Sequence, residues 1–103
     1  MACMFVSTSY TEAALRCIDI SNVFSWCMEY VKARAPLSPD CCEHLKALNN
    51  EAKTTEDRQQ ICKCIRIDYG QSLKIKNDIA AGLDGKCGVN LGTNPSTDCN
   101  KLK

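Results

Sequence analysis

The sequence predicts an all-α domain whose helices are tied together by disulfide bonds. Three observations support this class: apolar residues recur at steps of three and four, strand-like alternation is scarce, and nine of the 103 residues are cysteines. A chain of this length forms one domain, near the lower limit at which a single core is stable. Cross-links would compensate for a small core.

The first two of four predicted helices precede residue 50. The first presents one apolar face, formed by Ile20, Val23, Phe24, Cys27, Tyr30 and Val31. The second begins at residues 38–40, where Ser-Pro-Asp combines a serine cap, a proline at the first helical position and an early acid. It would direct inward Cys41, Cys42, Leu45 and Leu48.

The third helix opens at Thr54, three residues before Asp57, in a pattern close to a capping box. It continues to about Asp68, and Gly70 is expected to break it.

A fourth helix is predicted from about Lys74 to Ala81, with Gly82 at its end. One side of it would carry Ile75, Ile79 and Leu83. From Asp84 onward, frequent glycine, asparagine and serine predict an extended C-terminal loop without regular structure. The result is a four-helix domain with a cross-linked C-terminal loop.

The cysteine spacing favours disulfides over zinc. An adjacent pair, Cys41-Cys42, and a Cys62-x-Cys64 pair are poor chelating arrangements, and His44 is the only histidine. On a helix, Cys62 and Cys64 point about 200° apart, so they must reach partners on opposite sides of the bundle. No metal or other cofactor is expected.

The N-terminal region has a different character. It begins apolar and then reaches Thr11-Glu12-Ala13, with small residues at both positions that a signal peptidase reads. We interpret residues 1–13 as the remnant of a secretion signal and residues 14–103 as the domain; a merely disordered N-terminus is the alternative. Removal of Cys3 would leave eight cysteines, an even number suited to four bridges.

Charge, hydropathy and motif content argue against several function classes. The chain has 13 basic and 12 acidic residues without a basic stripe, so nucleic-acid binding has little support. No apolar run approaches the roughly 20 residues of a transmembrane helix. No Gly-x-Ser-x-Gly motif is present, and the single histidine lacks a motif partner, so an enzyme is not expected.

From Cys17 to Cys99 the spacing is Cys-x9-Cys-x13-Cys-Cys-x19-Cys-x-Cys-x22-Cys-x11-Cys. This spacing resembles the eight-cysteine motif of plant non-specific lipid transfer proteins, in the prolamin-like superfamily, and is most similar to type 1. The local segments 54–58, 80–83, 87–90 and 95–99 share the resemblance. It implies a right-handed bundle of four helices around an apolar tunnel that holds a fatty acid, acyl-CoA or lysophospholipid.

The resemblance also implies a pairing that spacing alone leaves open. In type 1 members it corresponds to Cys17–Cys64, Cys27–Cys41, Cys42–Cys87 and Cys62–Cys99. Type 2 members exchange the partners of Cys62 and Cys64. The residue between these two is usually polar in type 1, and here it is Lys63.

Arg58 is the candidate polar contact for a ligand. It shares a helix face with Ile61, Cys62 and Ile65, and a charged planar fork above an apolar stripe suits a carboxylate or phosphate. The resemblance implies that this arginine lies near the cavity mouth. The alternative is a solvated surface arginine paired with Glu51 or Asp57.

The apolar candidates for lipid binding cannot be separated from ordinary core residues by sequence. They are Ile20, Val23, Phe24, Leu45, Leu48, Ile61, Ile65, Ile75, Ile79, Leu83, Val89 and Leu91.

The chain departs from the type 1 pattern after its Cys-Gly-Val segment. Pro-Tyr-x-Ile-Ser is usual there, but Leu91 is followed by Gly-Thr-Asn, so the loop is shorter and lacks the tyrosine. We expect a small, flexible lid and altered head-group selectivity, with Arg58 lacking its usual partner.

Three function classes are compatible with these features. The first is a secreted, extracellular, monomeric carrier that binds fatty acids or phospholipids and contacts membrane surfaces transiently. The second is a defence or enzyme-inhibitor protein of the same superfamily, and the third is an apoplastic signalling or adhesion partner. A filled core without a tunnel would favour the inhibitor.

Overall fold

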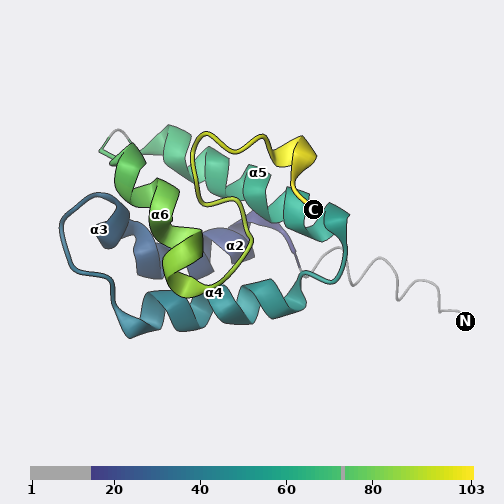
Figure 1. Ribbon diagram of the computed structural model, residues 1–103, viewed down its shortest axis with the longest axis horizontal. Helices are drawn as coiled ribbons and strands as arrows, with labels where there is room; N and C mark the ends of the chain where they lie inside the picture. Colours follow the sequence, from purple (N-terminus) through teal and green to yellow (C-terminus); the bar gives the residue numbers. More distant parts are fainter. Residues whose placement is uncertain (1–14, 73) are drawn as a thin grey trace, which may run out of the picture.

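The computed structural model describes residues 15–72 and 74–103, in which every regular element is helical (Figure 1). The elements are α2 (Cys17–Phe24), η1 (Ser25–Cys27), α3 (Met28–Val31), α4 (Pro39–Glu51), α5 (Thr55–Gln71), α6 (Asn77–Cys87) and η2 (Cys99–Lys101). Taken together, α2, η1 and α3 form the first predicted helix, so the four-helix, all-α prediction is confirmed. The predicted signal remnant, residues 1–13, and Cys3 lie outside the described residues.

The first helical segment contains a short 3₁₀ turn, η1, that the apolar pattern did not indicate. The Ser25 hydroxyl donates a hydrogen bond to the Asn22 carbonyl at 2.6 Å, one turn back. A serine that bonds the preceding turn competes with the backbone ladder and bends helices. The apolar face nevertheless continues across the turn, because Phe24, Cys27 and Val31 are all fully buried.

Both predicted caps are confirmed. The Ser38 hydroxyl accepts from the Cys41 N–H at 3.1 Å, and Pro39 occupies the first position of α4. The Thr54 hydroxyl accepts from the Asp57 N–H at 3.0 Å, while the Asp57 carboxylate accepts from the Lys53 N–H at 3.1 Å. The bonds from the Cys41 and Asp57 N–H groups satisfy donors that a helix leaves without backbone partners.

The predicted bounds of the last two long helices are wrong. α5 continues through Gly70 to Gln71, and α6 covers Asn77–Cys87 instead of 74–81. An interior glycine costs a helix only about 1 kcal/mol relative to alanine. In α6 the burial of Leu83 and the tether at Cys87 outweigh that cost, and the helix ends at Gly88, whose φ is 71°.

The four helices surround one core. α2 packs against both α4 and α5, and α4 packs against α6. In Figure 1, α4 and α5 run along opposite edges of the view, with α6 passing in front of α2. The C-terminal loop returns from α6 along α5 and ends beside the beginning of α5, where the Gln59 amide donates to the Asn100 and Leu102 carbonyls.

Four disulfides join these elements in the implied type 1 pairing. Their Cα–Cα distances are 5.1 Å for Cys17–Cys64, 4.9 Å for Cys27–Cys41, 5.0 Å for Cys42–Cys87 and 5.6 Å for Cys62–Cys99. Cys64 therefore ties α5 to α2, while Cys62 ties the opposite side of α5 to the C-terminal loop. Each bridge contributes roughly 2–4 kcal/mol, mainly by restricting the unfolded chain.

None of the helices in the described part of the chain combines the length and apolar character needed to cross a membrane. Within residues 15–72 and 74–103, no group of three or more His, Cys, Asp or Glu side chains is arranged to hold a metal ion.

Candidate functional site

Arg58 lies in the first turns of α5, half-buried between α4 and the C-terminal loop. Its Nη1 donates to the Asn49 side-chain oxygen at 2.6 Å and to the Asn90 carbonyl at 3.0 Å. The Asn90 N–H donates to the same Asn49 oxygen at 3.3 Å. Among the described residues, neither Glu51 nor Asp57 forms an ion pair with Arg58. The guanidinium is thus held by neutral groups only.

The apolar candidates gather on the inner side of this arginine. Eight belong to the buried core: Ile20, Phe24, Leu45, Leu48, Ile61, Ile65, Leu83 and Leu91. Three more pack against that core: Val23, Ile75 and Val89. Ile79 is half-buried on α6 and lies outside the cluster. Since Ile61 and Ile65 follow Arg58 on one face of α5, the polar group stands at the edge of this apolar cluster.

In the described part of the chain, the interior is closed around seven of the apolar candidates. Seven of the candidates have an exposed fraction of 0–1%: Ile20, Phe24, Leu45, Ile61, Ile65, Leu83 and Leu91. A side chain without exposed surface contacts protein atoms on every side, so no water-sized void lies against it. The tunnel that the resemblance implies is therefore shut at these residues, and a ligand among them would have to separate the helices.

Two hollows lie instead along the outer seam of α2 and α5. One, of about 330 Å³, is lined by Leu15, Arg16, Glu56, Asp57 and Gln60. The other, of about 230 Å³, is lined by Ser21, Ser25, Met28, Asp68, Gln71 and Ser72. Neither contains Arg58 or an apolar candidate, so they are separate from the cluster described above.

Asp84 holds the C-terminal loop and was not identified from the sequence. Its carboxylate accepts from the N–H groups of Leu91 (3.2 Å), Gly92 (2.9 Å) and Thr93 (3.3 Å), and its own N–H donates to the Thr93 hydroxyl at 2.9 Å. An acid in the last turn of a helix is unfavourable for the helix dipole. This unfavourable position of Asp84 is the sequence signal that could have indicated that its carboxylate contacts another part of the chain.

Tyr69 was also missed, although it lies on the same face of α5 as Arg58. It is 8% exposed, its ring meets Phe24 edge-on at 5.5 Å between centroids, and its hydroxyl donates to the Thr93 carbonyl at 2.6 Å. Burial, aided by the Asp84 carboxylate, raises the pKa of Tyr69 well above its usual range. Tyr69 therefore stays a neutral donor at physiological pH.

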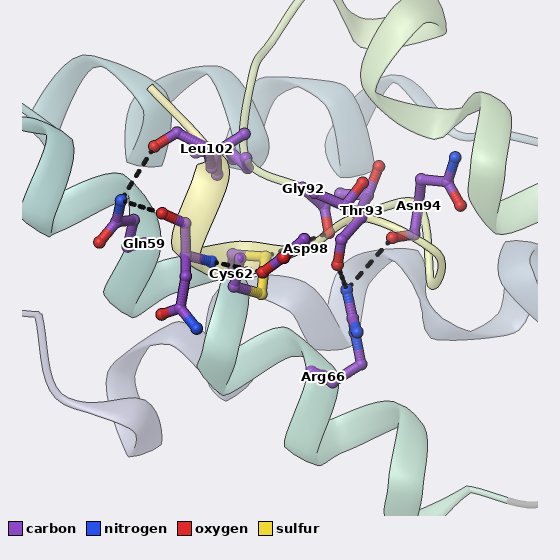
Figure 2. Close-up of a disulfide and its surroundings, with 12 residues drawn as sticks. Gln59, Cys62, Arg66, Gly92, Thr93, Asn94, Asp98 and Leu102 are labelled. Atoms are coloured by element: carbon purple, nitrogen blue, oxygen red, sulfur yellow. Dashed lines mark hydrogen bonds between the residues drawn. A yellow bond between two sulfur atoms is a disulfide. The ribbon is translucent and has the colours of Figure 1, made fainter.

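The loop that lacks the usual tyrosine is not a loose lid. Leu91, Gly92 and Thr93 are buried, and Figure 2 shows Gly92 and Thr93 near the disulfide that Cys62 forms. A Cβ on Gly92 would lie 2.6 Å from the Cys62 sulfur, and Gly92 has φ 73°. The expectation of a flexible lid is therefore wrong for these residues.

Arg66 fixes the next part of the loop. Its Nη2 donates to the carbonyls of Thr97 and, at 3.5 Å, of Asn94, and Figure 2 shows the bond to Asn94. Arg66 and Tyr69 thus contact the loop from one half of α5, while Arg58 and Gln59 contact it from the other half.

Fold and cysteine pairing define a class of small, disulfide-bonded helical proteins, and comparison places the chain within it. Residues 4–99 match the model of the protease inhibitor/seed storage/LTP family. The non-specific lipid-transfer protein Lac s 1 of Lactuca sativa is 39% identical over 100% of this chain and 90% of its own length. The chain therefore belongs to this family and, within it, to the plant non-specific lipid-transfer proteins.

Solved structures agree with this placement. The allergen Art v 3 is 43% identical with a TM-score of 0.76, covering 85% of this chain and 98% of its own. Non-specific lipid transfer protein 1 from barley, in complex with L-α-lysophosphatidylcholine, is 27% identical with a TM-score of 0.76, covering 85% and 99%.

Proposed function

We propose that this protein is a secreted carrier that binds a fatty acid, acyl-CoA or lysophospholipid among its core side chains and moves it between membranes or to the cell wall. The observation that carries the proposal is the apolar cluster with Arg58 at its edge. The relative from barley, whose structure holds a lysophospholipid, supports it.

Burial of the acyl chain would supply most of the affinity, at about 0.8 kcal/mol per methylene. Because the cluster is closed, α5 and the C-terminal loop must separate slightly near Arg58 to admit the chain. The four bridges, several of whose sulfurs lie within the core itself, retain the chain topology while the side chains around them rearrange. Rearrangement of the core reduces the net gain, since side-chain contacts of the empty protein are lost.

Arg58 would orient the polar end of the lipid. Its present partners are a side-chain amide and a backbone carbonyl, both neutral, and a carboxylate or phosphate would form stronger, charge-assisted bonds with the same fork. This mechanism needs no catalytic residue. It requires only transient contact with a membrane surface, and a monomer suffices.

Secretion is part of the proposal. Four disulfides in a domain of this size persist in oxidising compartments, which is consistent with an extracellular location. Residues 1–13 would then be removed as the end of a signal peptide, with residues 14–103 remaining as the mature domain.

Native mass spectrometry of the oxidised protein with palmitate tests the carrier directly. We expect a one-to-one complex at micromolar ligand, and absence of that complex would refute the carrier. Arg58→Ala should weaken palmitate binding about fivefold, the loss of about 1 kcal/mol expected for a partly exposed ionic contact. The matched control is Arg34→Ala: Arg34 pairs with Glu29 on the surface, away from the cluster, and its removal should leave the affinity unchanged.

The filled interior favours a second candidate, an inhibitor of digestive enzymes that acts through its surface. The family description includes protease inhibitors, and among the described residues seven apolar candidates have an exposed fraction of at most 1%. Inhibition of a serine protease at stoichiometric concentration, together with no palmitate complex, would establish this function in place of the carrier.

A further inference from the structure

Arg58 and Tyr69 mark the two ends of one stripe on α5. Their offset of eleven positions corresponds to about three full turns, so both side chains project from nearly the same face. Ile61 and Ile65 lie between them on that face, and both are fully buried. The distance along the helix axis is about 16 Å, similar to the length of an extended laurate chain.

Tyr69 is fixed in place more firmly than an ordinary core side chain. Its ring meets the edge of Phe24, which has no exposed surface, and its hydroxyl is bonded to the Thr93 carbonyl. Thr93 is itself fully buried and held by Asp84 through two hydrogen bonds. The ring therefore spans the space between α2, α5 and the C-terminal loop.

An acyl chain with its carboxylate at Arg58 and its methylenes along Ile61 and Ile65 would meet this ring. To pass it, the chain would have to move the ring and break the hydrogen bond from the Tyr69 hydroxyl to the buried Thr93 carbonyl. By contrast, Ile61 and Ile65 are held by apolar contacts alone, which a methylene chain can replace with contacts of the same kind.

We propose that Tyr69, supported by Phe24 and Thr93, sets the maximum length of acyl chain that this protein accommodates. The inference rests on the carrier function proposed above and adds its chain-length specificity. Affinity should rise from decanoate to laurate and gain nothing further with palmitate or stearate, because a chain stopped at the ring leaves its additional methylenes outside the core on the Arg58 side.

The test measures the affinities of decanoate, laurate, palmitate and stearate for the wild type, Tyr69→Ala and Tyr69→Leu. With the ring removed, the additional methylenes of stearate become buried, and the ratio of stearate to laurate affinity should rise at least about tenfold. Tyr69→Leu retains apolar packing, so it provides the test if Tyr69→Ala does not fold. Val31→Ala also removes buried volume, but from α3, and should leave the ratio unchanged.

The outcomes separate this inference from the carrier function. If no fatty acid binds to the wild type, the carrier function fails. If fatty acids bind and the stearate-to-laurate ratio of Tyr69→Leu agrees with the wild type within about twofold, the carrier stands and Tyr69 is not the length determinant. A ratio that rises equally in Val31→Ala would also overturn the inference, because any enlarged core would then have the same effect.

Discussion

The two ends of α5 hold the C-terminal loop in different ways. At the beginning, half-buried Arg58 reaches the exposed Asn90 through one hydrogen bond to its carbonyl. Toward the other end, Tyr69 and Asp84 bind residues 91–93, all of them buried. A single loop can therefore be easily displaced at one exposed residue and be firmly fixed by buried hydrogen bonds at the residues that follow.

This difference assigns different roles to the two ends. Polar bonds that face solvent are exchanged for a ligand at little net cost, because water or the ligand replaces them. Buried bonds have no such replacement. The Arg58 end therefore suits entry of a polar head group, and the Tyr69 end suits a fixed boundary.

The largest expected loss of stability comes from a substitution in the loop segment that is fixed at the Tyr69 end of α5. Gly92→Ala should destabilise the protein by about 2–5 kcal/mol, because alanine is strained at φ 73° and its Cβ collides with the Cys62 sulfur. Gly88→Ala is the matched control: φ is 71°, but no atom lies within 4 Å of the added Cβ, so only about 1–2 kcal/mol should be lost. Chemical denaturation of oxidised protein measures both. Equal losses would show that the contact with the disulfide is unimportant.

An intermediate effect is expected from Asp84→Ala. The N–H groups of Leu91, Gly92 and Thr93 would lose their acceptor, and we expect a loss of about 1–3 kcal/mol. Hydrogen exchange of these three amides should become faster. Asp78→Ala, at the exposed beginning of α6, should cost under about 1 kcal/mol and leave the three amides protected. Unchanged exchange in Asp84→Ala would contradict the assigned anchor.

The smallest effect at neutral pH is expected from Tyr69→Phe, which removes one hydrogen bond and about 1 kcal/mol. Its pH dependence is more informative. Above about pH 10 the unfolded chain loses the tyrosine proton, while the folded state retains it because the pKa of Tyr69 is raised. The unfolded state then binds fewer protons, so the free energy of unfolding falls as pH rises.

Comparison of two variants isolates this loss of stability at alkaline pH. Tyr69→Phe should show a weaker fall in stability above about pH 10 than the wild type, whereas Tyr30→Phe keeps the Tyr69 hydroxyl and should retain its contribution. If the free energies of unfolding of Tyr69→Phe and the wild type fell equally as pH rises, the folded state would not be retaining the Tyr69 proton.

Local signals in the sequence predicted much of the fold. Ser38 and Thr54 mark helix starts because a cap depends on residues within one turn, and the apolar faces follow from helical spacing. The predicted bounds of α6 were wrong because contacts with distant parts of the chain, the bridge at Cys87 among them, stabilise the helix beyond Gly82. The disulfide pairing followed from resemblance to a family, since spacing alone permits many pairings.

The candidate site was predicted only in part. Eleven apolar candidates do gather in or against one core, because their positions follow from helical faces, and Arg58 shares the α5 face of Ile61 and Ile65; that these residues bind lipid stays a prediction. Asp84 and Tyr69 were missed, since their roles depend on a loop that returns across α5 and α6 from later in the chain. The closed interior was equally beyond reach, because packing density depends on how all the helices meet.

The most direct test of the account is the location of a bound acyl chain. In a laurate complex, isotope-filtered NMR should show nuclear Overhauser contacts from the terminal methyl group to the ring protons of Phe24 and Tyr69. Contacts confined to the exposed side chains of Ile18, Trp26 and Ile67 would place the lipid on the surface and contradict the account.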